Sequence, residues 1–472
     1  MQTIDRDILR LAVPALGALV AEPLFLLTDT ALVGHLGETP LAALGVAGAV
    51  LQTVVGLLIF LAYATTPAVA RRLGAGDTAG AVKAGIDGMW LALGTGIALA
   101  LVGWPLAGSV VRLFGSTAAV SEAATTYLTI SLIGLPGMLL VIAATGLLRG
   151  LQDTRTPLVV AVGGFAVNAL LNALFIYGFG WGIAGSAIGT VLAQWGMAAV
   201  YVVIAVRAAR RVGVTLRPGL DGVGGAASAG GWLLLRTASL RAALLASIAV
   251  AAGFGVTSLA AFQIAMTIFS TLAFVLDSLA IAGQAMIGHG LGASDVPRVH
   301  AVTRRLIRWG VLSGVVLGAL LAVVAPFAGP VFSPSPSVQG AVTAVLLAMA
   351  VGIPLAGYVF VLDGVLIGAG DARYLALTGL VNLALYAPLL TAVALLHTAA
   401  TATDVAGLSG GLADPGGLAD PGSLADPSGP AGLPALVWLW LAFGLGYIGA
   451  RALTLGLRAR GSRWILTGAP AR

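Results

Sequence analysis

Twelve long apolar segments constrain this chain more than any other feature of its sequence. Each is long enough, or nearly so, to cross a bilayer as a helix of about 20 residues. Only 9% of the 472 residues are charged, against about 25% in a typical soluble domain. The chain is therefore predicted to be an all-α membrane protein with twelve transmembrane helices. The expected spans cover roughly residues 8–33, 40–70, 81–107, 123–148, 157–178, 184–206, 230–253, 258–288, 302–325, 338–368, 374–397 and 434–457.

Basic residues are distributed unequally between the loops that join these segments. If the N-terminus is inside the cell, Arg112 is the one arginine that falls in an outer loop. Because basic residues stay on the cytoplasmic side, we expect a multi-pass protein of the plasma or inner membrane with both termini cytoplasmic. The inner loops and the C-terminal tail then hold Arg71, Arg72, Arg149, Arg155, Arg207, Arg210, Arg211, Arg217, Arg298, Arg304, Arg305, Arg373, Arg458, Arg460 and Arg463.

The composition excludes several classes of function. The chain has no cysteine, so disulfides, zinc–thiolate sites and iron–sulfur clusters are excluded. The net charge of +6 does not predict nucleic-acid binding, because the basic residues are spread along short loops. Four histidines lie scattered near loops, without an HExxH or a Ser–His arrangement. No enzymatic activity, catalytic residue, metal site or cofactor is therefore predicted. The histidines are His35, His289, His300 and His397.

An internal repeat appears when the chain is shifted by 218 positions. Leu73–Asp77 (LGAGD) then matches Leu291–Asp295 (LGASD), and Gly146–Arg155 matches Gly364–Arg373. Shared Ala/Gly content does not explain the matched aspartates and arginines. These Asp–Arg loops lie on the inner side, where we expect them to fix helix ends rather than to bind substrate.

Each half holds six spans, so both halves enter the membrane from the same side and the repeat is parallel. We predict two six-helix bundles, an N-lobe of residues 1–215 and a C-lobe of residues 216–472. Repeated halves with a site at their interface are typical of secondary transporters that work by alternating access. A low-complexity outer loop at about 400–433 carries a hexad three times (GLADPG, GLADPG, SLADPS), and its composition predicts disorder.

Acids inside the spans are the first candidates for function, since a carboxylate at membrane depth is costly and usually faces a cavity. Glu22 and Asp29 are seven positions apart and share a face of the first span, which also contains Pro14 and Pro23. Glu22 could alternatively snorkel to water. Asp277 and Asp363 have no acidic counterpart in the first half, so they line the central cavity or only pack helices. The predicted substrate-cavity residues are Glu22, Gln263, Asp277, Gln284 and Asp363.

Several stretches together resemble the MATE family of efflux transporters, in particular its DinF-like branch. The resemblance covers nearly the whole chain except the hexad loop. It implies two six-helix bundles around a V-shaped cavity, and export of drugs or metabolites driven by inward H⁺ or Na⁺. The stretches are Leu27–Gly37 (LTDTALVGHLG), Leu73–Asp77, Phe274–Asp277 with Ala282–Gly288, and Phe360–Asp371 (FVLDGVLIGAGD).

The resemblance also implies an ion-coupling site in the first half. Asp29, Tyr127, Asn168 and Thr190 match the family's positions, whereas Asn172 stands where the family pattern has an aspartate. The lost negative charge favours protonation over Na⁺, since hard cations prefer several charged oxygens. The family's helix-bending proline matches Pro14. Taken singly, the tyrosine could be an interface aromatic, the amides could serve helix packing, and the threonine could bond a backbone carbonyl of its own helix.

These observations favour a secondary antiporter that exports small organic compounds in exchange for H⁺, or less readily Na⁺. Asp277 and Asp363 would then attract cationic substrates. The expected partners are small-molecule substrates and membrane lipids, and we expect a functional monomer. The alternative is a flippase for a lipid-linked precursor, which needs a basic cavity for the diphosphate. Arg236 and Arg241 are its only candidates in the sequence.

Overall fold

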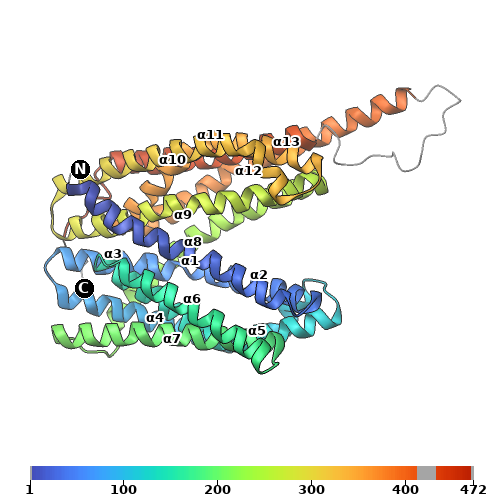
Figure 1. Cartoon of the computed structure of the whole chain (residues 1–472). Helices are drawn as coiled ribbons and strands as arrows, with labels where there is room; N and C mark the ends of the chain where they lie inside the picture. The colour runs from blue at the N-terminus through green and yellow to red at the C-terminus, as the bar shows by residue number, and fades with distance from the viewer. Residues whose placement is uncertain (1–2, 412–431, 469–472) are drawn as a thin grey trace.

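The computed structural model describes residues 3–411 and 432–468 as a bundle of long helices, with no strand among them (Figure 1). Twelve helical segments in the described part are long and apolar enough to cross a membrane, which confirms the predicted fold class. The elements are α1 (Thr3–Gly34), α2 (Glu38–Leu58), α3 (Phe60–Gly74), α4 (Thr78–Arg112), α5 (Ala118–Gly150), α6 (Arg155–Ala173), η1 (Leu174–Gly178), α7 (Gly182–Val212), α8 (Leu220–Ala252), α9 (Val256–Gly292), α10 (Val296–Phe332), α11 (Pro336–Gly368), α12 (Ala372–Gly411), α13 (Gly432–Leu441), η3 (Ala442–Tyr447) and α14 (Ile448–Arg460).

The internal repeat is visible in the positions of the helix ends. Helices α5 and α11 begin and end at positions 218 apart, as do the α2–α3 pair and α9. The left-handed backbone of the inner turns recurs at the same offset. The φ angles are 80° at Gly76 and 56° at Ser294, and 61° at Gln152 and 75° at Gly370. The two halves therefore share the backbone conformation even of single residues in these turns.

Aspartates of the repeated loops hold the helix ends, as the sequence predicted. The Asp77 carboxylate accepts the Gly80 N–H at 2.7 Å at the start of α4. Asp295 accepts the Arg298 N–H at 3.0 Å at the start of α10. Side-chain acceptors at this position satisfy backbone donors that the helix itself leaves free. Asp153 does the same for α6.

The repeat is broken at one informative position. The helix of the second span is interrupted at Ile59, between α2 and α3. Its counterpart at the offset of 218 is Asp277, which lies in the uninterrupted α9. Helix α1 continues through Pro14 and Pro23 without interruption, so a bend at Pro14 during transport stays a prediction.

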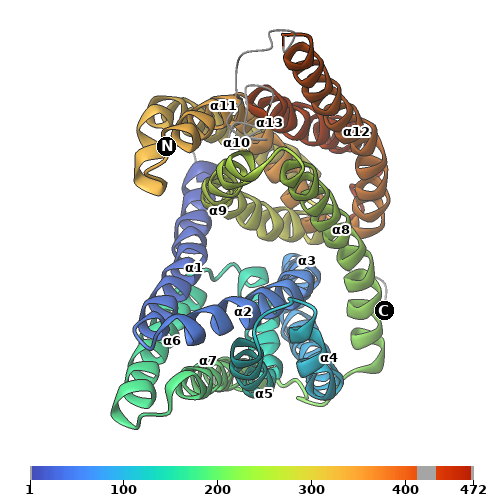
Figure 2. The ribbon, with the colours of Figure 1, turned by 90° about the vertical axis from the view of Figure 1, so that its right-hand side faces the viewer.

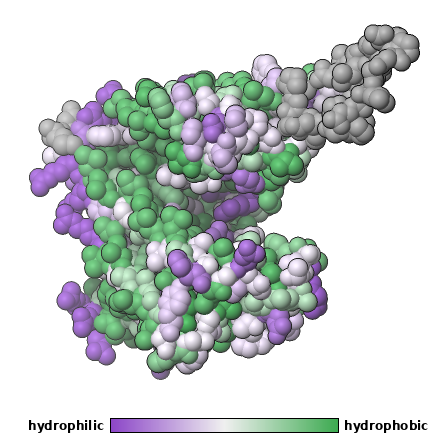
Figure 3. All heavy atoms as spheres, turned by 45° about the vertical axis from the view of Figure 1, so that its right-hand side comes forward, coloured by the Kyte–Doolittle hydropathy of each residue, from purple (hydrophilic) through white to green (hydrophobic). Residues whose placement is uncertain are grey.

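Two groups of helices make up the molecule, the N-half (α1–α7) and the C-half (α8–α14). The halves approach each other at the end where both described termini lie, and they diverge toward the other end (Figure 1). Helices α1 and α8 run between the two groups on opposite sides (Figure 2). A hollow lies between the halves, and part of its lining is hydrophilic (Figure 3). The boundary that the sequence predicts, near residue 215, falls between α7 and α8.

Polar contacts join the halves at the closed end. The Arg305 guanidinium of α10 donates hydrogen bonds of 2.5 Å to both carboxylate oxygens of Asp5 in α1. Trp309 Nε1 also donates to this carboxylate, at 2.9 Å. The linker between the halves is also anchored, because Lys83 Nζ of α4 donates to the Arg217 carbonyl at 2.9 Å.

Two glycines bring backbones together at the same end. A Cβ atom on Gly74, at the end of α3, would lie 2.0 Å from the carbonyl oxygen of His289 in α9. A Cβ atom on Gly292, at the end of α9, would lie 1.9 Å from the carbonyl oxygen of Arg71 in α3. The two contacts are related by the 218-position repeat. Only glycine allows an approach this close.

Helix α12 differs from its predicted extent, since it continues to Gly411 rather than ending near residue 397. Most of the predicted low-complexity loop, including nearly all of the three hexads, falls at residues 412–431 and lies outside the described residues.

Candidate functional site

Asp29 lies inside the N-half with 4% of its surface exposed. Its Oδ1 atom accepts hydrogen bonds from Asn172 Nδ2 at 2.7 Å and from the Ser186 hydroxyl at 2.8 Å. Its Oδ2 atom accepts from the Tyr127 hydroxyl at 3.4 Å. The donors come from α5, α6 and α7. A buried carboxylate is tolerated only with such partners, so this cluster is arranged to hold the charged form.

The predicted residues around Asp29 form one continuous hydrogen-bond network. Asn172 also donates to Asn168 Oδ1 at 3.2 Å, and Asn168 Nδ2 donates to Thr190 Oγ1 at 3.0 Å. The two asparagines are one helical turn apart on α6 and therefore share a face. The Oδ1 atom of Asn172 is buried and has no partner among the described residues. One acceptor next to the carboxylate is thus left available.

Ser186 belongs to this network but was not predicted. It precedes Thr190 by four positions on α7, so both hydroxyls face the same side of the helix. That spacing was the available signal, but a serine among glycines and alanines is inconspicuous. Gly189, also on α7, was missed too. A Cβ atom there would lie 2.1 Å from Asn172 Oδ1, so Gly189 makes room for the amide.

The remaining predicted cavity residues lie apart from the Asp29 network. Glu22, two turns before Asp29 on α1, is exposed and has no hydrogen-bond or ion-pair partner among the described residues. Gln263 of α9 is also exposed. Gln284 is buried, and its Oε1 atom has no partner in the described part of the chain. A role of these three side chains in substrate binding stays a prediction.

Asp363 of α11 is fully occupied by two arginines. Its Oδ1 atom accepts from Arg236 Nε at 3.2 Å, and its Oδ2 atom pairs with Arg451 Nη2 at 3.0 Å and with Arg236. All three side chains are buried. The Arg236 guanidinium also lies 6.0 Å from the ring centre of Tyr63, which belongs to α3 of the other half. Asp363 therefore presents no free carboxylate oxygen to a cation.

Asp277 of α9 has basic neighbours from both halves. Arg149 of α5 and Arg236 of α8 are close enough to act on it electrostatically. Arg149 is only 9% exposed, and its guanidinium makes no hydrogen bond or ion pair with any described residue. The sequence did not predict a basic cluster here, since Arg149 was placed in an inner loop.

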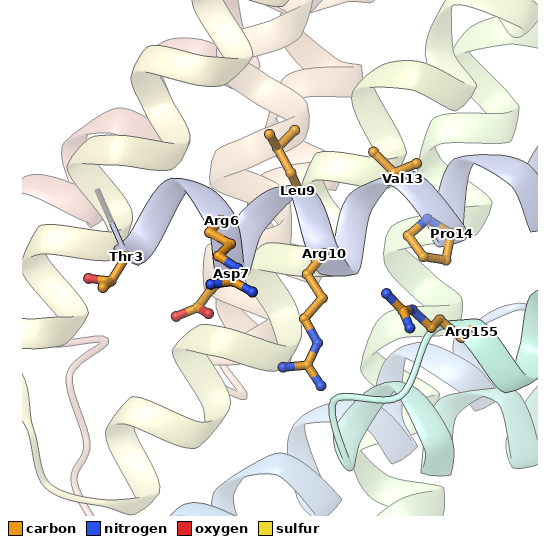
Figure 4. Close-up of a pocket in the computed structure, with 8 residues that line it drawn as sticks. All are labelled: Thr3, Arg6, Asp7, Leu9, Arg10, Val13, Pro14 and Arg155. Atoms are coloured by element: carbon orange, nitrogen blue, oxygen red, sulfur yellow. The ribbon is translucent and has the colours of Figure 1, made fainter. Parts of the chain in front are cut away.

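A separate groove of about 830 Å³ lies where α1 and α6 begin (Figure 4). Arg6 and Arg10 of α1 extend toward it, and Arg155 lies at its edge (Figure 4). None of these three guanidinium groups has a partner among the described residues. The groove is lined by Thr3, Arg6, Asp7, Leu9, Arg10, Val13, Pro14 and Arg155.

Comparison with known proteins agrees with the sequence resemblance. The MatE family model matches residues 14–174 and 236–391. Protein DETOXIFICATION 44, chloroplastic, from Arabidopsis thaliana is 30% identical over 391 residues, which cover 79% of this chain and 74% of that protein. DNA damage-inducible protein F from Escherichia coli strain K12 is 28% identical over 388 residues, 78% of this chain and 81% of that protein.

A solved structure shares the fold. It is the "outward-facing conformation of a multidrug resistance MATE family transporter of the MOP superfamily". It superposes with a TM-score of 0.82 at 21% identity, covering 98% of this chain and 96% of that one. With the matching family model, twelve membrane-length helices and two repeated halves, the chain belongs to the MATE family of multidrug and toxic-compound efflux transporters.

Proposed function

We propose that this protein is a proton-driven antiporter that exports small organic compounds, and that Asp29 is the residue that takes up and releases the proton. The observation that carries the proposal is the network around Asp29. One buried carboxylate accepts hydrogen bonds from three side chains on three other helices.

The charged and protonated forms of Asp29 need different hydrogen bonds. The charged form accepts from all three donors. The protonated form must itself donate, and the free Oδ1 atom of Asn172 becomes its acceptor if the amide group turns. Such a change rearranges contacts between α1, α6 and α7. A proton that binds one packing more tightly than the other shifts the population between them.

The composition of the network favours H⁺ over Na⁺. Asp29 supplies its only carboxylate, because Asn172 replaces the second acid of the family pattern. The Asn168 Oδ1 and Thr190 Oγ1 atoms already accept hydrogen bonds from neighbouring amides. A hard cation needs several oxygen ligands at once, so it would have to displace these bonds.

Export from everted vesicles tests the proposal. A panel of dyes and metabolites is followed under an imposed pH gradient and, separately, under an imposed Na⁺ gradient. Asp29→Asn should insert and fold but lose export under the pH gradient, because it cannot change charge. Glu22→Gln on the same helix face is the comparison and should reduce export less than Asp29→Asn does. Undiminished export by Asp29→Asn would place the coupling residue elsewhere.

We also propose that the protein works as a monomer in the cytoplasmic membrane with both termini inside. The arginine distribution supports this orientation, and the described termini lie at one end of the bundle. At that end, the groove beside Arg6, Arg10 and Arg155 suits the phosphate groups of anionic lipids in the inner leaflet. The flippase alternative is not favoured, since the family match points to efflux transport.

A further inference from the structure

A cluster of charges lies where the two halves of the molecule meet. Arg149 comes from the N-half, and Arg236, Arg451, Asp277 and Asp363 come from the C-half. All but the half-buried Asp277 are buried. Helix α3 packs against both α8 and α9, and Tyr63 of α3 faces the Arg236 guanidinium. The cluster therefore spans the interface at which a transporter built from two repeats binds its substrate.

The cluster is basic, because three arginines face two aspartates. Asp363 is shared by Arg236 and Arg451, and Asp277 is within electrostatic range of Arg149 and Arg236. One positive charge stays unbalanced in a region where an unpaired ion is costly. A single anionic group would balance the charges.

Two side chains of this region have hydrogen-bond donors that no described residue accepts. The guanidinium of Arg149 makes no bond to any described residue although it is only 9% exposed. The Tyr447 hydroxyl is buried and has no partner in the described part of the chain. It lies within electrostatic range of Arg236 and Arg451. A buried hydroxyl without a partner indicates an acceptor that the described residues do not supply, and the unpaired guanidinium of Arg149 can bind the same acceptor.

The repeat does not account for these arginines. At an offset of 218, Arg149 corresponds to Ile367 and Arg236 corresponds to Ala18. Each half therefore contributes its own basic residue to the interface, as expected of residues that contact a ligand rather than maintain the shared helix framework.

We propose that the transported compounds carry an anionic group, such as a carboxylate, which binds between Arg149 of the N-half and Arg236 of the C-half. Asp363 is a positioning residue, which holds Arg236 and Arg451 in place. The rest of the substrate occupies the hollow between the halves (Figure 3). The proposal rests on the proposed transport function and reverses the expectation that Asp277 and Asp363 attract cations.

Three probes with one fluorophore test the proposal: anionic dansylglycine, neutral dansylglycinamide and cationic N-(2-aminoethyl)dansylamide. Their binding to the purified full-length protein in nanodiscs is measured by fluorescence. Dansylglycine should bind at least about tenfold more tightly than the neutral amide, because hydrogen bonds to a charged group are stronger than those to a neutral one. Equal binding of the three probes, tighter binding of the cation, or no binding of dansylglycine would overturn the proposal.

Variants test which residue causes the preference for dansylglycine over its amide. Arg149→Gln should remove most of the advantage of dansylglycine over its amide, and Arg149→Lys should retain part of it because the charge remains. Arg210→Gln, at the exposed end of α7, is the control and should leave the preference unchanged. A preference that survives Arg149→Gln contradicts the assignment. If folding of that variant fails, the comparison of probes on the unaltered protein still decides.

Export assays separate this proposal from the proposed function. If dansylglycine binds but is not exported from everted vesicles under a pH gradient, the anion site stands and proton-driven export is wrong. If the cationic probe is exported and dansylglycine neither binds nor inhibits, export stands and the anion site is wrong.

Discussion

Alanine at Gly74 or Gly292 should shift the protein away from the conformation in which the two halves are closed at the end that carries the described termini. The Cβ atom of alanine at position 74 would lie 2.0 Å from the His289 carbonyl oxygen, and at position 292 it would lie 1.9 Å from that of Arg71. Ordinary contacts begin at 3.4 Å. The backbones must therefore separate by 1.4 Å (3.4 − 2.0) and 1.5 Å (3.4 − 1.9), respectively.

The expected cost falls on one conformation only. Overpacking of a tight contact costs about 1–3 kcal/mol, which changes a two-state equilibrium about 5- to 150-fold. The contact joins α3 of the N-half to α9 of the C-half, so it is lost when the closed end opens. Both alanine variants should therefore favour the state that is open at this end, and to a similar degree because the repeat relates the two glycines.

Spin labels measure this shift directly. The chain has no cysteine, so Arg210→Cys on α7 and Arg304→Cys on α10 provide two defined labelling sites, both exposed. Electron paramagnetic resonance should show a larger population of long distances in Gly74→Ala and Gly292→Ala than in the parent. Gly94→Ala, where a Cβ atom meets nothing within 4 Å, is the control. Folded alanine variants with an unchanged distance distribution would refute the reasoning.

Three further perturbations have defined outcomes. Ser186→Ala removes one hydrogen bond to the Asp29 carboxylate, which contributes about 1.5–3 kcal/mol when the carboxylate is charged. The pH of half-maximal export should therefore rise by about one unit or more. An unchanged pH profile would exclude Ser186 from coupling. Asp5→Asn leaves Arg305 without its ion-pair partner. The same spin labels should then report opening of the closed end, and a distance distribution like that of the protein with Asp5 would contradict this. Neutralising Arg6, Arg10 and Arg155 together should abolish any rise in melting temperature on moving from phosphatidylcholine to phosphatidylglycerol nanodiscs; a rise that persists would show that the groove does not bind anionic lipids.

The fold could be predicted from the sequence because the two sequence features that indicate it are local or periodic. Apolar segments separated by short loops predict spans, and the constant offset of 218 predicts repeated halves. The interruption of the helix at Ile59 could not be predicted, because an isoleucine in an apolar segment has no feature that ends a helix. The extension of α12 to Gly411 was missed for a similar reason, because an Ala- and Thr-rich segment supports both helix and loop.

The two polar clusters differ in how much the sequence disclosed. The residues around Asp29 were predicted from the family resemblance, which gives positions on separate helices. The partners of Asp363 were not predicted, because Arg236 and Arg451 lie 127 and 88 positions away from it. An acid in an apolar span predicts a polar site, but the net charge of that site depends on residues far away in the sequence. For this reason the sequence favoured cationic substrates, whereas we propose anionic ones from the positions of these arginines.

Helix α1 provides a physical route from the proposed proton site to the closed end of the molecule. Asp29 binds donors of the N-half near one end of α1, while Asp5 at the other end binds Arg305 of the C-half. The two acids are 24 positions apart (29 − 5), about 36 Å along a helix that rises 1.5 Å per residue. A change of packing at Asp29 can therefore act on the contact at Asp5 through one rigid element. If it does, Asp29→Asn and Asp5→Asn should have non-additive effects on the spin-label distances, as coupled residues do. Additive effects would show that the proposed proton site acts on the closed end by another path.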